Sequence, residues 1–314
     1  MKMKRRALLQ AAAMLAVAAG RPRRSLADTP EPSAAGEPPP MHRAPPLAAD
    51  CHIHVYDSRF PTAPNAILLP PDARIDSYLV VQRRLGTART VLVQPSTYGA
   101  DNRCMLHALA RMGAEARGVA VVDAEVSDAA LRRLAAAGVR GIRFNFALAG
   151  AGASVELIEP LSARVADLGW HVQLNVKADQ IVQLEPLLAR LRSPIVFDHL
   201  ARIPPETGID HPAFAVVQRL LQRGRVWVKL SGAYLESKVG PPSYADVGVI
   251  ARAFVTAAPQ RLVWGSDWPH PSVHAARPDD AVLFDALCAW APNDELRRQI
   301  LVANPEALYG FSKA

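Results

Sequence analysis

Residues 195–231 read IVFDHLARIPPETGIDHPAFAVVQRLLQRGRVWVKLS and contain one complete strand–helix–strand repeat. Apolar, β-branched runs at 195–199 and 226–231 predict two buried strands, and the helical pattern at 212–223 predicts the helix between them. A helix that connects two strands in this way places them parallel in one sheet. This stretch therefore predicts a protein of the α/β class.

The same repeat extends along the chain in both directions. Six more apolar runs predict strands, at 50–56, 90–94, 118–123, 141–145, 171–176 and 262–267. Helical patterns lie between them, for example at 128–137, 156–168, 179–190, 244–257, 278–290 and 294–303. Eight such units fit a closed barrel better than an open doubly wound sheet. No glycine-rich phosphate-binding motif follows the first strand. We therefore predict a single (β/α)8 TIM barrel over residues 47–314.

The excess positive charge lies entirely in the first 27 residues. The formal net charge is +7, and residues 1–27 carry seven Lys and Arg side chains and no acid, so the rest of the chain has no net charge. A nucleic-acid partner is therefore not predicted. Basic residues at 1–6, an apolar run at 7–19 and a small-residue site at 25–27 predict a cleavable signal peptide over residues 1–27. The apolar run is too short to span a bilayer.

The signal favours one export route. The segment KRRALLQ at 4–10 resembles the twin-arginine motif, so the twin-arginine machinery is the expected partner during transport. An ordinary Sec signal or an uncleaved anchor is the alternative. Residues 28–46 contain seven prolines and predict a disordered linker. We therefore expect a periplasmic protein with no stable membrane insertion after signal cleavage.

The cysteines predict neither a disulfide framework nor a structural zinc site. Cys51, Cys104 and Cys288 are few, odd in number and lack CxxC spacing. Cys51, next to the first histidine motif, is expected to be a small buried strand residue rather than a nucleophile.

Polar residues at the ends of the predicted strands indicate a site, because active sites of such barrels lie at the C-terminal ends of the strands. His52 and His54 are two residues apart on the first strand, so both should point into the barrel. Two inward imidazoles can bind a metal, polarise a carbonyl or relay protons. A pair of core histidines bonded to the backbone is the alternative.

Two more strands end in residues of the same kind. His199 follows the sixth strand and Asp267 ends the eighth, and a carboxylate is costly to bury unless it is paired. A structural Asp267 that caps the turn before Pro269 is the alternative. His270 is expected to be a solvated loop residue, as is His274. His171 begins its strand at the opposite end of the barrel, where a structural role is expected.

Several blocks of sequence around these residues resemble the amidohydrolase superfamily, and within it the metal-independent branch of 2-pyrone-4,6-dicarboxylate lactonases. The blocks include DCHIHVYD (50–57), VLVQPSTYGADN (91–102), GVRGIRFN (138–145), FDHLARIP (197–204) and VWGSDWPHP (263–271). This resemblance runs through the whole chain that follows the linker.

The resemblance implies a role for each polar residue. Asp267 would be the general base that takes a proton from the attacking water. His52, His54 and His199 would orient that water or polarise the scissile carbonyl. Arg143 would hold a substrate carboxylate, for which a guanidinium is suited, with an ion pair to a buried acid as the alternative. Secondary polar contacts to the substrate are expected from Ser96, Tyr98, Asn102 and Tyr234.

The chain departs from metal-dependent members of the superfamily. Those members place a carboxylated Lys or a Glu on the fourth strand and a His at the end of the fifth. Here the fourth strand offers Arg143 and the fifth ends near Asn175. We therefore expect no metal and no other cofactor, and mononuclear zinc on His52, His54 and Asp267 is the alternative.

The chain also departs from the dicarboxylate lactonases. The pattern of that branch has further arginines near two positions where this sequence has Ala149 and Leu235. Because the predicted site has fewer arginines to pair with carboxylates, a substrate with two carboxylates is not expected. We expect a hydrolase that opens a small carboxylated lactone by attack of an Asp-activated water. GAYLES at 232–237 also resembles sugar-lactone isomerases, which are the first alternative. A non-catalytic periplasmic binding barrel is the second, and the carboxylate at the reacting position counts against it.

Overall fold

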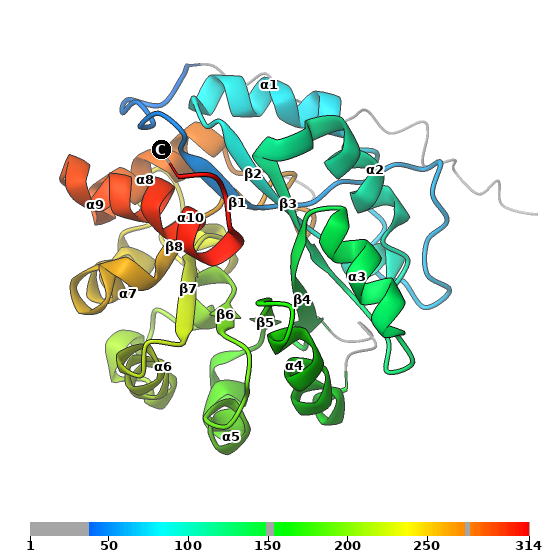
Figure 1. Cartoon of the computed structure of the whole chain (residues 1–314). Helices are drawn as coiled ribbons and strands as arrows, with labels where there is room; N and C mark the ends of the chain where they lie inside the picture. The colour runs from blue at the N-terminus through cyan, green and yellow to red at the C-terminus, as the bar shows by residue number, and fades with distance from the viewer. Residues whose placement is uncertain (1–37, 149–153, 274–276, 314) are drawn as a thin grey trace, which may run out of the picture.

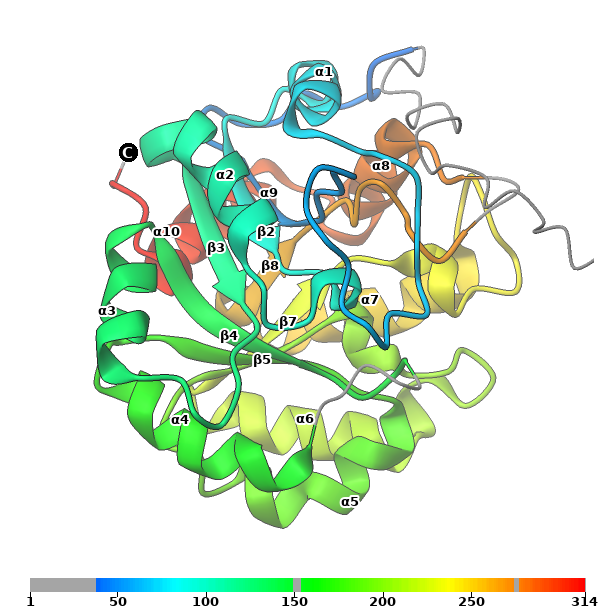
Figure 2. The same cartoon turned by 90° about the vertical axis from the view of Figure 1, so that its right-hand side faces the viewer.

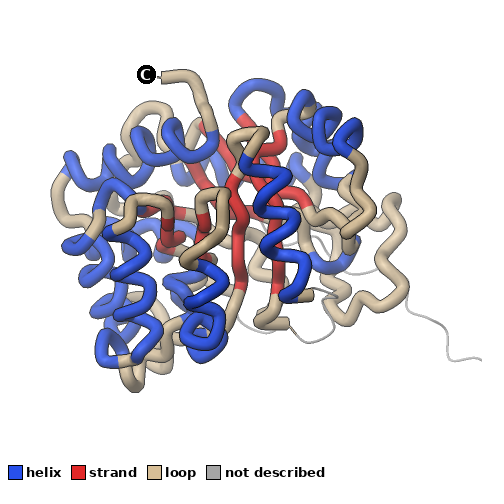
Figure 3. Tube along the Cα trace, turned by 60° about the horizontal axis from the view of Figure 1, so that its bottom comes forward, coloured by secondary structure: helices blue, strands red, loops and turns tan. Residues whose placement is uncertain are grey.

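Eight short parallel strands pair in the order of the sequence in the computed structural model, which describes residues 38–148, 154–273 and 277–313. A bridge between Ile53 and Trp268 joins the chain after the last strand to the first one. This arrangement confirms the predicted (β/α)8 TIM barrel (Figure 3). The strands are β1 (Ala49–Ile53), β2 (Arg89–Val93), β3 (Ala116–Ala120), β4 (Val139–Asn145), β5 (His171–Asn175), β6 (Ile195–Phe197), β7 (Val226–Leu230) and β8 (Leu262–Trp264).

Helices surround the strands in a ring that follows the sequence (Figure 1). In the perpendicular view, α4, α5 and α6 lie together on one side of the barrel, and α1 lies on the opposite side (Figure 2). Two short helices complete the chain after α8. The helices are α1 (Ile75–Leu85), α2 (Arg103–Met112), α3 (Asp128–Ala136), α4 (Ile158–Ala166), α5 (Ala178–Leu188), α6 (Pro212–Gln222), α7 (Ala245–Ala257), α8 (Asp280–Trp290), α9 (Asp294–Arg298) and α10 (Asn304–Tyr309).

The alternation of side chains along each strand separates the core between sheet and helices from the barrel interior. On β7, Val226 and Val228 pack in the large cluster beneath the helices. Trp227 belongs instead to a smaller apolar cluster with Cys51 and residues of other strands. Lys229 has the same parity as Trp227 and is fully buried. A lysine therefore lies inside the barrel.

A bulge in β1 sets the direction of the first histidine. The register between β1 and β2 shifts between Asp50 and Ile53. A bulge places one extra residue on a strand, so that two neighbours can face the same side. Cys51 packs in the interior cluster, and the next residue, His52, also faces the barrel interior.

The C-terminal segment closes the N-terminal end of the barrel. Tyr309 packs edge-on against His171, the first residue of β5, with ring centroids 5.4 Å apart. Arg117 of β3 donates to the carbonyls of Tyr309 and Gly310. Arg89, at the start of β2, donates to the carbonyl of Ser312. His171 therefore lies at the end of the barrel opposite to the predicted site.

His171 is a buried imidazole whose two ring nitrogens lack hydrogen-bond partners among the described residues. Burial, followed by the ammonium of Lys229, lowers the pKa of His171 to about 3. A folded-state pKa below the unfolded value means that the stabilisation is complete above about pH 6.5 and is lost as pH falls toward 3. Acid should therefore destabilise this protein through His171.

We expect His171→Leu to flatten this acid dependence. One such histidine costs about 1.4 kcal/mol of unfolding free energy for each pH unit below about 6.5. Between pH 7 and pH 4.5 the variant should therefore lose about 2–3 kcal/mol less than wild type, as measured by urea unfolding. His107→Leu, at an exposed position, is the matched control. An unaltered acid slope in His171→Leu would show that this imidazole is protonated in the fold.

The chain before β1 is described from residue 38 onward. Residues 38–46 form no helix or strand, yet the amides of Met41 and His42 donate to Asp285 of α8, and Arg84 of α1 donates to the carbonyl of Pro38. The described end of the predicted linker therefore has polar partners on two helices. The predicted signal peptide, residues 1–27, and the linker up to residue 37 lie outside the described residues. No helix in the described part of the chain is long and apolar enough to cross a membrane.

Candidate active site

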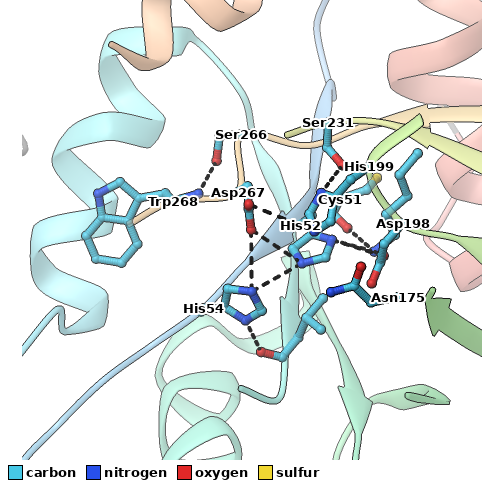
Figure 4. A network of polar contacts seen from close by, with 12 residues as sticks. Cys51, His52, His54, Asn175, Asp198, His199, Ser231, Ser266, Asp267 and Trp268 are labelled. Atoms are coloured by element: carbon cyan, nitrogen blue, oxygen red, sulfur yellow. Dashed lines mark hydrogen bonds and ion pairs between the residues drawn. The ribbon is translucent and has the colours of Figure 1, made fainter. Parts of the chain in front are cut away.

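Three histidines and an aspartate meet at the C-terminal ends of β1, β6 and β8 (Figure 4). The Nε2 atoms of His52 and His54 lie 3.3 Å apart. The ring centroids of His52 and His199 lie 4.8 Å apart. Oδ1 of Asp267 lies 3.4 Å from Nε2 of His54 and 3.6 Å from Nε2 of His52. The structure thus brings together the four residues that the sequence selects as catalytic.

Asp267 is held in place through its backbone and through one carboxylate oxygen. Its amide donates to the carbonyl of His52 over 2.8 Å, and its backbone takes a left-handed conformation with φ of 65°. Such a φ is uncommon for a residue with a side chain and is sustained by surrounding contacts. The hydroxyl of Tyr234 donates to Oδ2 over 2.7 Å. Oδ1 has no hydrogen-bond partner within the described chain and faces the histidines.

Asp267 is ionised at neutral pH. Burial raises the pKa of this carboxyl group, but His199, His54 and His52, whose imidazoles become positively charged when they are protonated, outweigh burial and hold the pKa well below its usual range. A buried carboxylate with one free oxygen can accept a proton from a bound water, which is what a general base does.

A close approach of β8 to β1 makes this geometry possible. A Cβ atom on Gly265 would lie 2.5 Å from the Cβ of His52, so only glycine fits at this position. The two strands are also joined by Asp50, whose carboxylate accepts from the amide and the hydroxyl of Ser266 over 2.9 and 2.6 Å. Burial raises the pKa of Asp50 to about 6. This polar clamp sets the position from which Asp267 projects.

A left-handed turn directs His199 into the site. His199, Leu200, Ala201 and Arg202 all have φ between 50° and 56°. Left-handed residues with side chains cost roughly 1–2 kcal/mol each. Nδ1 of His199 lies 3.0 Å from the hydroxyl of Ser231 on the loop after β7. Burial lowers the pKa of His199 to about 4, so the ring is neutral at neutral pH.

His52 on β1 and His54 just after it contact different polar partners through Nδ1. Nδ1 of His54 lies 2.8 Å from the carbonyl of Val93, and because a carbonyl only accepts, Nδ1 carries a proton; in the neutral ring Nε2 then has the lone pair. Nδ1 of His52 lies 3.3 Å from the ammonium of Lys229, which only donates, and 3.3 Å from Oδ1 of the Asp198 carboxylate, which only accepts. Lys229 therefore favours a proton on Nε2 of His52, which faces His54 and Asp267, whereas Asp198 favours a proton on Nδ1.

Lys229 was missed by the sequence analysis. It is fully buried, and its Nζ donates to the carbonyl of Cys51 over 2.8 Å. Burial lowers the pKa of Lys229 to about 8, which keeps most of it charged at neutral pH. Burial, followed by this ammonium, holds the pKa of His52 well below its usual value. His52 is therefore uncharged at neutral pH.

Arg143 of β4 contacts a buried acid, Asp198. Its Nε donates to Oδ2 of Asp198 over 3.0 Å, which is the ion pair named as the alternative role for this arginine. Oδ1 of Asp198 lies 3.3 Å from Nδ1 of His52 and 3.8 Å from Nζ of Lys229. The terminal amino groups of the guanidinium have no partner among the described residues, so Arg143 retains donors for a ligand.

His52, His54 and Asp267 also have the spacing of zinc ligands. Zinc bonds of about 2.0–2.2 Å place tetrahedral ligands roughly 3.3–3.5 Å apart, and the three ligand atoms lie 3.3 to 3.6 Å apart. Nδ1 of His54 already donates to a backbone carbonyl, as metal-bound histidines do. For His52 to bind a metal through Nε2, its proton must lie on Nδ1, which has the carboxylate of Asp198 on one side and the ammonium of Lys229 on the other.

The four residues predicted to contact the substrate differ in the hydrogen bonds that they make. The Tyr98 hydroxyl accepts from the amide of Asp57 and donates to its carbonyl, so it holds the loop after β1. The amide of Asn102 bonds the backbone of Ala100 and Val121 in the same manner. Tyr234 contacts Asp267, as described above. Ser96, in contrast, is half-buried at the C-terminal end of the barrel.

Two further residues near the site differ from the sequence interpretation. The prediction that His270 is solvated is wrong: the residue is buried, and its Nε2 lies 3.0 Å from Asp280, because the loop folds back through a hydrogen bond from the His270 amide to the Asp267 carbonyl. His274 lies outside the described residues. Tyr56 was not selected, yet it is buried, and its hydroxyl has no partner in the described chain. Burial and the Asp267 carboxylate raise the pKa of Tyr56 well above its usual value.

A carboxylate and three imidazoles at the C-terminal ends of barrel strands define the class of a barrel hydrolase. A model of the family described as Amidohydrolase matches residues 49–311. The chain therefore belongs to the amidohydrolase family, as the resemblance implies.

Named relatives and a solved structure support this assignment along almost the whole chain. The chain is 38% identical to a 2-pyrone-4,6-dicarboxylate hydrolase of Comamonas testosteroni, over 86% of this chain and 92% of the relative. It is 34% identical to a D-galactarolactone isomerase of Agrobacterium fabrum, over 84% and 91% respectively. The crystal structure of an Agrobacterium tumefaciens protein in its apo state matches with a TM-score of 0.80 and 31% identity, covering 93% of this chain and all of that one.

Proposed function

We propose that this protein is a hydrolase that opens a carboxylated lactone with a water activated by Asp267. The carrying observation is the free Oδ1 of an ionised Asp267, which faces His52 and His54 inside the barrel. The relative that hydrolyses 2-pyrone-4,6-dicarboxylate supports a cyclic ester as the substrate. A screen of carboxylated lactones with a pH indicator tests the proposal, because each ring opening releases a proton at neutral pH.

The roles of the side chains follow from their donors and acceptors. Oδ1 of Asp267 takes a proton from water as the water oxygen attacks the lactone carbonyl. The lone pair on Nε2 of His54 accepts the second hydrogen of that water. The Nε2 proton of His52 faces the same space and stabilises the negative charge that develops on the carbonyl oxygen. Asp267 then returns its proton to the ring oxygen as the ester bond breaks, which gives a hydroxy acid.

We propose that this reaction proceeds without a metal. A zinc ion on His52, His54 and Asp267 would supply an activated water and polarise a carbonyl. Lys229 opposes this arrangement, because its ammonium favours the His52 tautomer that has no lone pair at Nε2. Arg143 adds a second buried cation on Asp198, the carboxylate that would otherwise orient a metal-bound His52. Both cations favour a site that works through hydrogen bonds.

Metal analysis of the purified protein should accordingly show far less than one zinc per chain, and chelators should leave activity intact. We expect Lys229→Met, which removes the ammonium, to raise the affinity for zinc by about 10–100-fold, as measured by titration calorimetry. Lys177→Met, at an exposed position, serves as the matched control. Chelator inactivation of wild type that one zinc per chain reverses would contradict metal-free catalysis.

Tyr56 is proposed as a substrate contact because its buried hydroxyl is unused and is influenced by the charges of Asp267 and Arg143. We expect Tyr56→Phe to lower kcat/KM by about tenfold, the effect of one hydrogen bond. The melting temperature should not fall, since no protein hydrogen bond is lost. Tyr309→Phe removes another unpartnered buried hydroxyl at the far end of the barrel and is the control. Equal kinetics in Tyr56→Phe and wild type would refute the contact.

Isomerisation of a lactone is the second candidate activity, and the relative that isomerises D-galactarolactone favours it. The same base and imidazoles would serve a substrate hydroxyl in place of water. Hydrolysis incorporates one oxygen atom from the solvent into the product, whereas transfer of the ester to another hydroxyl of the same molecule incorporates none. Isotope labelling of the water therefore separates the two reactions.

We further propose that the protein is exported to the periplasm by the twin-arginine route and that the signal is removed near Ala27. The support is the basic n-region, the short apolar run and the small-residue site at 25–27. Changing Arg5 and Arg6 to Lys should retain the precursor in the cytoplasmic fraction. Unchanged export of that variant would favour the Sec route.

A further inference from the structure

A row of uncharged polar side chains lies above Arg143 at the C-terminal end of the barrel. Arg143 pairs in register with Gln173, and Asn145 pairs with Asn175 two residues further along both strands. Side chains two apart on a strand point to the same side. Asn145 and Asn175 therefore face the barrel interior, one layer nearer to the loops than Arg143.

Hydrogen bonds join these two amides to the loop after β2. Nδ2 of Asn175 donates to Oδ1 of Asn145 over 3.1 Å, and Nδ2 of Asn145 donates to the hydroxyl of Ser96 over 3.0 Å. Ser96 accepts in this contact, so its own hydrogen remains available. Oδ1 of Asn175 is buried and has no partner in the described chain. Buried polar atoms are nearly always paired, so an unpaired acceptor beside a free donor indicates a ligand position.

The row has no positive charge of its own. Ser96, Asn145 and Asn175 are all uncharged. A carboxylate that loses its water against these three side chains would find no cationic partner among them, which is costly. A hydroxyl or carbonyl oxygen can instead exchange hydrogen bonds with a serine hydroxyl and an amide at little electrostatic cost.

We propose that Ser96, Asn145 and Asn175 bind an uncharged oxygen substituent on the lactone ring, next to the carboxylate held by Arg143. The inference rests on the proposed lactonase function and narrows its substrate class. The substrate is then a monocarboxylated lactone that carries a hydroxyl or carbonyl group, rather than a dicarboxylated lactone.

Three related γ-lactones test this subsite. They are 5-oxotetrahydrofuran-2-carboxylate and its derivatives with a hydroxyl or a second carboxylate on carbon 3. Dissociation constants are measured by calorimetry on Asp267→Asn protein, which binds without rapid turnover, and kcat/KM is measured on wild type. We expect the hydroxyl compound to bind about tenfold more tightly than the other two, as one well-placed hydrogen bond allows.

Substitutions test whether the preference for the hydroxyl compound arises from Ser96, Asn145 and Asn175. Asn175→Leu should remove the tenfold preference and leave the affinity for the unsubstituted lactone unaltered. Ser96→Ala, at a half-buried loop position, should reduce it and provides the test if Asn175→Leu does not fold. Asn293→Leu, an exposed amide that caps α9, should leave the order of affinities unaltered.

Tightest binding of the dicarboxylate, equal weakening of all three ligands by Asn175→Leu, or no binding of any ligand would overturn the subsite. Different outcomes would refute the proposed hydrolase activity. If the hydroxyl compound binds best but none of the lactones is opened by wild type, the subsite stands and the reaction is wrong. If all three are opened without preference, the reaction stands and the subsite is wrong.

Discussion

Asp267→Asn should lower kcat by about 10²–10⁴-fold and leave KM nearly unchanged, because a positioned general base contributes that much to the rate. An asparagine has almost the same shape, and its carbonyl oxygen can still accept from Tyr234. The backbone bond from residue 267 to the carbonyl of His52 does not depend on the side chain. The variant should therefore fold and bind substrate normally, and steady-state kinetics with a lactone substrate measures the loss.

Asp57→Asn is the matched control for this prediction. Asp57 is also a buried acid on the chain that leaves β1, but its carboxylate is occupied by Arg59. Its loss should leave kcat within a few-fold of wild type. If Asp267→Asn folds and turns over a substrate at the wild-type rate, Asp267 is not the base.

Arg143→Met should lower kcat/KM for a carboxylated lactone by about 10–100-fold, since a charged hydrogen bond contributes roughly 1.5–3 kcal/mol. The effect should appear mainly in KM. A neutral lactone of the same ring size should be affected much less, because it has no carboxylate for the guanidinium to hold. The ratio of kcat/KM for the two lactones is the quantity to measure.

The contact between Arg143 and Asp198 requires a second variant. Removing the arginine also takes a partner from a buried carboxylate, which destabilises the fold. Arg143→Lys keeps a positive charge near Asp198 but loses the fork that binds a carboxylate with two hydrogen bonds. We expect it to be more stable than Arg143→Met and still to discriminate poorly between the two lactones. Equal losses on both lactones would mean that Arg143 acts through Asp198 and not on the substrate.

The barrel could be predicted from the sequence because its signals are local. Each strand is a short apolar run, and each of the eight occurs in the expected order, although several end earlier than expected. β8 ends at Trp264 rather than near residue 267, since Gly265 and Ser266 leave the ladder to approach β1 and Asp50. Such a departure depends on contacts between residues more than 200 positions apart, and no local pattern reveals it.

The polar residues at the strand ends could also be identified from the sequence, but their hydrogen-bond and ion-pair partners could not. The alternation on β7 places Lys229 on the same side as Trp227, and this parity is the signal that identifies a lysine inside the barrel. Tyr56 continues the alternation of His52 and His54 in the same way. That Tyr98 and Asn102 hold loops, whereas Asn175 has a free oxygen, depends on the packing of several loops at once.

The decisive measurement is ring opening of a carboxylated lactone in ¹⁸O-labelled water by protein freed of metal with a chelator. If Asp267 activates the water, turnover continues at the untreated rate, with one labelled oxygen in the newly formed carboxylate of each product molecule. Product without label would establish an isomerase, and loss of turnover that returns with zinc would place the metal, rather than Asp267, at the attacking water.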